Sequence, residues 1–167
     1  MNMYDSSVPV FTHFLHSLSA ILKKAEAHCV AKKIDPSVML NLRLAPDMFA
    51  LTRQVQIASD AAKGAGARLA GVAVPSFPDD EKTFEELQAR IGKTIAFLSG
   101  LSKAQFEGAE SRAISLKAGG REMNFTGFAY LETWAKPNFY FHATTAYAIL
   151  RQGGVELGKS DYLAGGQ

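Results

Sequence analysis

The sequence predicts an all-α protein, a four-helix bundle with a small β-hairpin before the last helix. Four segments repeat apolar residues every three or four positions, which is the spacing of one helix face. A further segment alternates apolar and polar residues on both sides of a Gly-Gly pair, which is typical of a hairpin. The 167 residues, 47% of them hydrophobic, suffice for a substantial core, so we expect residues 1–167 to form a single domain.

Composition excludes several classes of protein. The formal net charge of +2 is too small to indicate a nucleic acid or an anionic membrane as partner. No apolar run reaches the roughly 18 residues of a transmembrane helix, and residues 1–10 lack the basic and apolar regions of a signal peptide. The single cysteine, Cys29, excludes an intrachain disulfide and fits a reducing compartment. We therefore expect a cytoplasmic protein.

The first helix is predicted from Val8 to Lys32, because its apolar residues follow a regular helical stripe. Cys29 continues that stripe, which favours a buried and inert thiol. His13 and His16 are three residues apart and have the spacing of a chelating pair. They project from the back of the stripe, however, so we interpret them as surface histidines.

The second helix is predicted from about Ala45 to Lys63, after an apolar connector at 34–44 that we expect to form a short packed helical turn. Its start is indicated by Pro46 in the first turn and by Asp47 near the positive end of the helix dipole. The alanines that follow suggest that this helix runs on toward Leu69.

Two polar residues of this second helix, Asp47 and Gln54, are seven positions apart and share one edge of its core stripe. Asp47 has the position of a capping acid and Gln54 that of a boundary residue. Alternatively, both line a cavity that His142 also reaches.

The third helix is indicated by turn residues and acids at 76–81, followed by an apolar stripe from Phe84 to Leu101 with Arg90 on its solvated side. Residues 112–125 then form the predicted hairpin. A two-stranded hairpin is marginal alone, so its apolar side chains are expected to pack on the end of the bundle near Asn138.

Pro137 is expected to break or kink the last helical region, because its ring clashes with the carbonyl four residues back. We predict a short helix at 127–136 and a fourth long helix at 137–152, ended by Gly153 and Gly154. On that fourth helix, Asn138, His142 and Thr145 share one face.

Residues 153–160, Gly-Gly-Val-Glu-Leu-Gly-Lys-Ser, match the phosphate-binding pattern G-x-x-x-x-G-K-[ST]. That chemistry needs a strand before the loop and a helix after it, so that backbone amides converge on the phosphate. Here a helix precedes the motif and a short tail follows, so we predict no nucleotide site.

Three segments of the chain carry a resemblance to a known group of proteins. They are Pro137-Asn138-Phe139-Tyr140-Phe141-His142, Leu44-Ala45-Pro46-Asp47-Met48 and Gln54-Val55-Gln56-Ile57-Ala58. Together with the order of helices and hairpin, they resemble an uncharacterised bacterial and fungal family of unknown function, grouped with the DinB/YfiT-like metalloenzyme superfamily. The resemblance covers about residues 8–165 and implies a DinB-like four-helix bundle.

The resemblance also implies where a metal would bind. DinB-like proteins often hold a metal on three histidines, two from His-x-x-x-His on the last helix and one from the second helix, and some are metal-dependent thiol transferases. In this chain the pair on the last helix is Asn138 and His142, and the second helix offers only Asp47 or Gln54. Neutral amides are poor ligands for zinc or nickel, so we expect the metal site to be lost and no cofactor to be present.

These observations leave three hypotheses for function. The first is a small-molecule site in which His142 is the one candidate general acid or base near neutral pH. Alternatively, His142 is a core residue satisfied by a hydrogen bond to Asp47 or Gln54. The candidate ligand-binding residues are Asp47, Gln54, Trp134, Asn138, His142 and Thr145.

The second hypothesis is a non-enzymatic homodimer that pairs through a face of the second or fourth long helix. Its expected anchors are residues off the core stripes, because exposed aromatics and arginine are typical of interfaces. They are Tyr140, Tyr147 and Arg151, with Phe49 and Ile57. A divergent metal-dependent thiol transferase or hydrolase is the third hypothesis.

Overall fold

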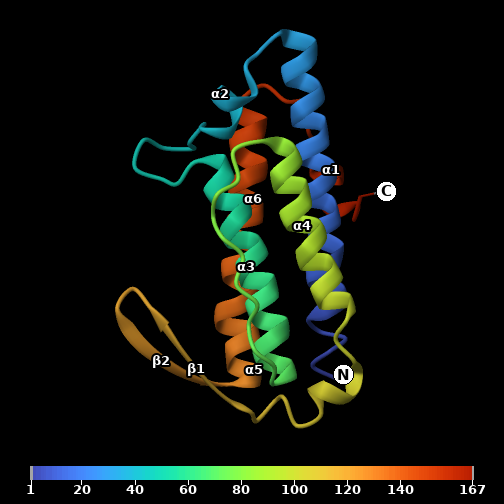
Figure 1. Cartoon of the computed structure of the whole chain (residues 1–167), viewed down its shortest axis with the longest axis vertical. Coiled ribbons are helices and arrows are strands. Elements are labelled where there is room, and N and C mark those ends of the chain that lie inside the picture. Colours follow the sequence, from blue (N-terminus) through green and yellow to red (C-terminus); the bar gives the residue numbers. More distant parts are fainter. Residues whose placement is uncertain (1, 167) are drawn as a thin grey trace.

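The computed structural model describes residues 2–166, and four long helices run side by side along its long axis (Figure 1). They are α1 (Val8–Lys32), α3 (Leu51–Ala70), α4 (Phe84–Ser99) and α6 (Lys136–Gln152). Helix α3 packs on α4 and α6, and α1 packs on the same two helices, which closes the bundle. The predicted four-helix bundle is confirmed.

The remaining elements are short. They are α2 (Pro36–Leu40), the 3₁₀-helix η1 (Lys103–Phe106), strands β1 (Ala113–Ala118) and β2 (Arg121–Thr126), α5 (Gly127–Tyr130), the π-helix η2 (Leu131–Ala135) and α7 (Lys159–Leu163). Within residues 2–166, every helix is too short or too polar to cross a membrane.

Helix α1 has the predicted bounds, and its apolar stripe lies in the core. Phe11 is fully buried and meets Phe139 of α6 edge to face, with ring centroids 5.1 Å apart. Cys29 is buried as expected, and this burial is the main cause that raises the pKa of its thiol. The thiolate is therefore disfavoured at neutral pH, which agrees with an inert cysteine.

Helix α3 is the most enclosed element: 14 of its 20 residues are buried. Small residues let its neighbours come close, and at Gly66 an added Cβ would meet the side chains of Leu98 and Leu101. The predicted start of this helix near Ala45 is wrong, because residues 42–50 form a closed loop. That loop is held by the Leu51 amide, which donates to the Leu42 carbonyl, and by Arg43, which donates to the Met48 carbonyl.

Helix α4 begins with a capping box, in which Thr83 and Glu86 satisfy each other's backbone amides. Helices α3 and α4 run in the same direction, so residues 72–83 must return along the length of α3 before α4 begins (Figure 1). We call residues 72–83 the strap.

The hairpin is confirmed, with Ala118 opposite Arg121 and Ala113 opposite Thr126. Its two-residue turn is Gly119-Gly120, and both residues have positive φ, as the tight turns of hairpins require. One face packs on the bundle through buried Ile114 and through Phe125, whose ring lies 6.0 Å from that of Trp134.

The predicted break at Pro137 is wrong, because the chain stays helical from Gly127 to Gln152. A π-helix at Leu131–Ala135 lies directly before the proline. Its wider turn changes the position of the carbonyls that an α-helical proline ring would strike. The side chain of Asn138 donates to the Trp134 carbonyl at 2.8 Å, which satisfies an acceptor of this irregular turn.

The backbone leaves no room for a side chain at Gly127. A Cβ at Gly127 would overlap the carbonyl oxygen of Ala109, a main-chain atom that cannot rotate away. We predict that Gly127→Ala lowers the free energy of unfolding by about 1–3 kcal/mol in chemical denaturation. The control Gly92→Ala lies in α4 with open space around its new methyl, and should raise the free energy by about 0.5–1 kcal/mol. Equal effects of the two substitutions would contradict this packing.

Candidate functional site

His142 of α6 faces Gln54 of α3 across the most extensive helix–helix contact of the bundle. The imidazole Nδ1 lies 2.6 Å from Oε1 of Gln54. The amide Nε2 of Gln54 donates to the Phe49 carbonyl at 3.0 Å, which fixes the orientation of the amide because a carbonyl only accepts. Oε1 is then the acceptor, so Nδ1 of His142 carries the proton and donates.

This hydrogen bond selects the tautomer of His142 that is protonated on Nδ1, so Nε2 is unprotonated and carries a lone pair. The ring is half-buried, and its burial lowers the pKa of His142 from the ordinary value of 6.5; the positive charge of Arg53 lowers it further. His142 is therefore neutral at pH 7. A neutral imidazole with an orientated Nε2 can accept a hydrogen bond or take up a proton.

Nε2 of His142 makes no hydrogen bond to any residue from 2 to 166. Three side-chain atoms of that range are fully buried and lack a partner: Thr12 Oγ1, Ser59 Oγ and Arg90 Nε. Nε2 of His142 is not one of them. Since Nε2 is neither bonded nor fully buried, it reaches the surface.

Two other sequence-predicted residues use their polar groups within the last helix. Thr145 is buried and donates to the Phe141 carbonyl one turn back at 2.7 Å. The amide nitrogen of Asn138 is engaged by the Trp134 carbonyl, and Trp134 itself packs on the hairpin. Thr145 therefore has no free donor, whereas Asn138 keeps a second amide N–H and its Oδ1.

Asp47 does not lie in a helix. It is exposed in the loop at 42–50, and its carboxylate forms no hydrogen bond or ion pair with another described residue. The expectation that Asp47 shares a helix edge with Gln54 is wrong, because the helix begins at Leu51.

A hollow of about 440 Å³ lies beside the pair on the outer face of α6. Phe141 connects the two features, because it lines the hollow and its ring meets that of His142 edge to face at 5.2 Å. The hollow is mostly apolar, with lining residues Leu44, Pro137, Tyr140, Phe141, Thr144, Thr145 and Ala148.

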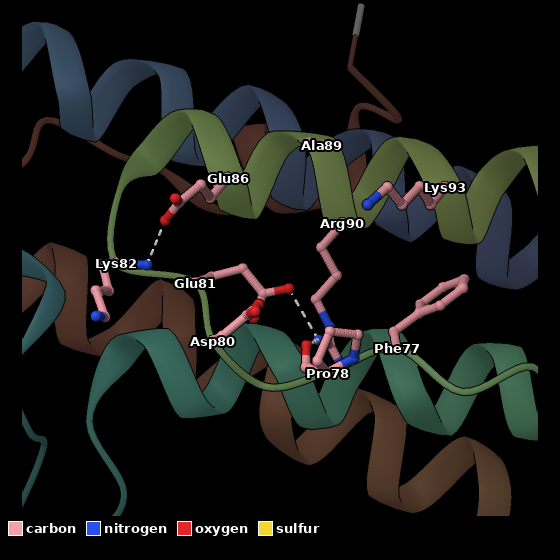
Figure 2. Close-up of a pocket in the computed structure, with 9 residues that line it drawn as sticks. All are labelled: Phe77, Pro78, Asp80, Glu81, Lys82, Glu86, Ala89, Arg90 and Lys93. Atoms are coloured by element: carbon pink, nitrogen blue, oxygen red, sulfur yellow. Dashed lines mark hydrogen bonds and ion pairs between the residues drawn. The ribbon is translucent and has the colours of Figure 1, made fainter.

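A second polar site, which the sequence did not predict, surrounds Arg90 of α4. Arg90 was expected in solvent, yet it is 2% exposed and pairs with carboxylates of α3 and the strap. Figure 2 shows its side chain crossing from α4 to the strap at Pro78. Helical spacing offered one signal, because Arg90 follows buried Leu87 by three residues.

Metal ligands do not converge at the places that the resemblance implies. Within residues 2–166, no three His, Cys, Asp or Glu side chains lie close enough to hold a metal ion. Around His142, the neighbouring positions carry the amides of Gln54 and Asn138. A metal would have to bind the neutral oxygens of these amides, and Oε1 of Gln54 already accepts from His142. This donor set does not fit a zinc or nickel ion.

The motif at 153–160 likewise lacks the geometry of a phosphate loop. It joins α6 to the five-residue α7, and the Gly158 amide at the start of α7 donates to Asp161 of the same turn at 2.8 Å. A helix before the loop and an internally capped turn after it do not form a phosphate cradle.

The order of the helices and the hairpin before the last helix are those that the resemblance implies for a DinB-like helical-bundle protein. A crystal structure described as a DinB family member protein from Shewanella denitrificans is 46% identical, with a TM-score of 0.87 over 96% of this chain and 90% of that one. The model of a domain of unknown function, DUF1993, matches residues 3–163, and the chain belongs to this family. No curated protein matches.

The lowered pKa of His142 has a consequence for stability. Because the folded state holds the proton less tightly than the unfolded state does, unfolding takes up a proton as the pH falls below 6.5. We predict that the wild-type chain loses stability as the pH falls through this range, and that His142→Gln reduces the loss, measured by chemical denaturation at several pH values.

The matched control is His16→Gln, at an exposed position of α1. It should keep the wild-type dependence on pH. A pH dependence that is the same in all three proteins would contradict the lowered pKa.

Proposed function

We propose that the chain binds a small molecule against Nε2 of His142 and does so without a metal. The observation that carries the proposal is the Gln54–His142 hydrogen bond, which engages Nδ1 and leaves Nε2 unprotonated and not fully buried. A fully buried structural histidine would have both ring nitrogens paired within the protein, whereas His142 has one of them paired.

The chemistry of Nε2 limits what such a molecule offers. A lone pair on a neutral imidazole accepts a hydrogen bond, so the bound group carries a donor such as a hydroxyl, an amide or a thiol. The apolar hollow beside Phe141 would take an apolar portion of the same molecule. If the site is catalytic, His142 is the general base, and Gln54 holds its ring in place.

The absence of a metal is part of the proposal. His142 is one imidazole where the resemblance implies three, and Oε1 of Gln54, the atom through which that amide would bind a metal, already accepts a hydrogen bond from His142. A divergent metal-dependent thiol transferase would need ligands from elsewhere. The three other histidines, at 13, 16 and 28, all lie on α1.

The proposal is tested by ligand-observed NMR with a library of fragments that carry one hydrogen-bond donor and one apolar ring. We predict that fragments bind the wild-type chain equally with and without EDTA. His142→Gln should weaken them about tenfold, because loss of one directed acceptor costs on the order of 1 kcal/mol.

The control His16→Gln should leave binding of the same fragments unchanged, because its side chain lies on exposed α1. The proposal fails if the fragments bind all three proteins equally. It also fails if binding disappears with EDTA.

The second candidate function is a homodimer that pairs through α6 and the loop at 42–50. It is favoured by apolar side chains at the hollow on α6, where Phe141 is 55% and Leu44 is 39% exposed. Phe49, in the same loop as Leu44, is 56% exposed. Exposed aromatic groups of this kind are typical of interface anchors.

Two of the anchors expected from the sequence are not free. Tyr140 packs against Phe14 of α1 with ring centroids 5.2 Å apart, and Tyr147 packs against Tyr162 of α7 at 6.1 Å. Both are half-buried within one chain, so Phe141 replaces them as the central residue of the proposed interface.

Light scattering on a size-exclusion column tests this interface. We predict a dimer for the wild-type chain and a monomer for Phe141→Ser. The matched control is Phe128→Ser in α5, which removes an equally exposed phenylalanine (59%) away from the hollow and should stay dimeric. A wild-type monomer at micromolar concentration excludes the dimer.

A further inference from the structure

Of the strap, residues 72–83, Val72 at its start packs on the hydrophobic core, and no side chain further along is an apolar anchor there. Each of its residues is half-buried or exposed. From residue 73 to residue 81, no main-chain group is hydrogen-bonded to another main-chain group of the described chain. An extended segment with neither buried apolar side chains nor backbone ladders must be held by its side chains and their partners.

Arg90 of α4 is the centre of that attachment (Figure 2). Its Nη1 donates to the Pro78 carbonyl at 2.8 Å and pairs with Glu81 at 2.9 Å. Its Nη2 lies 2.9 Å from Asp79 and 2.9 Å from Asp60 of α3. One buried guanidinium thus joins α3, α4 and three residues of the strap, Pro78, Asp79 and Glu81.

Residues of α3 hold the same part of the strap from the other side. Arg53 pairs with Asp79, and Gln56 donates to Glu81 at 2.9 Å. Lys63 lies 4.1 Å above the ring of Phe77, and its ammonium pairs with Asp60 at 2.8 Å. Two strap carboxylates therefore contact both helices. Asp79 pairs with Arg53 and Arg90, and Glu81 contacts Gln56 and Arg90.

We propose that these contacts form a latch, and that the strap opens and closes as a unit while the four helices stay packed. Asp79 and Glu81 are the two strap carboxylates that compensate Arg90, whose own side chain is only 1% exposed. Removing a partner from such a buried pair leaves an uncompensated charge, so opening is strongly opposed while both carboxylates are present.

The latch controls a hollow of about 340 Å³ between the strap and α4. Phe77, Pro78 and Glu81 of the strap form one wall, and Ala89, Arg90 and Lys93 of α4 lie across from them (Figure 2). Since one wall belongs to the strap, the hollow exists only in the closed state. Opening would remove it and uncover Arg90 and Lys63, which are otherwise 2% and 4% exposed.

Limited proteolysis tests the latch. Lys82 is an exposed trypsin site at the end of the strap, and Arg121 at the hairpin turn is an exposed site far from it that serves as internal reference. We predict that Asp79→Asn combined with Glu81→Gln raises the ratio of cleavage at Lys82 to cleavage at Arg121 by at least about tenfold. Helical circular dichroism should be unchanged.

Arg90→Met is the second variant, because an apolar side chain of similar length fills the buried site without a charge. It should raise the same ratio and retain the helices. Asp161→Asn, which breaks the exposed pair with Lys24, should leave the ratio at the wild-type value. A ratio within about twofold of wild type in both latch variants overturns the proposal, and so does loss of the whole helical fold in both.

Discussion

Nearly complete burial of α3 is the constraint on which both polar sites depend. Polar side chains on a helix enclosed by α4, α6 and the strap need partners within the protein, because an unpaired polar group away from water costs on the order of 1–3 kcal/mol. Among residues 2–166, Ser59 Oγ is the one buried side-chain atom of α3 that lacks a partner. Gln54 and Lys63 are both buried on this helix. Gln54 is satisfied by His142 and the Phe49 carbonyl, and Lys63 by Asp60.

The regular parts of the fold were predictable because their signals are local. The apolar stripe of α1 and the Gly-Gly turn of the hairpin depend on neighbouring residues, and both were predicted correctly. The start of α3 and the helix across Pro137 were not. The start of α3 depends on the hydrogen bond from the Leu51 amide to the Leu42 carbonyl, which closes the preceding loop. The continuous helix across Pro137 depends on a π-helix that the residue pattern did not predict.

The candidate site was predictable only in part. The residues of one helix face follow from periodicity, which is why His142 and Gln54 could be singled out and their hydrogen bond considered. The two residues are 88 positions apart in the sequence. Their contact depends on how α3 and α6 are aligned, which periodicity does not specify. The same limit explains Arg90: its position on α4 looks solvated until the strap covers it with Asp79 and Glu81.

The two sites are linked through one turn of α3. Arg53 and Gln54 are adjacent in sequence, yet Arg53 pairs with Asp79 of the strap while Gln54 binds His142. The charge of Arg53 is one of the two causes that lower the pKa of His142, and Asp79 partly neutralises that charge. Arg53 therefore belongs to both sites, because it pairs with Asp79 of the strap and its charge acts on His142.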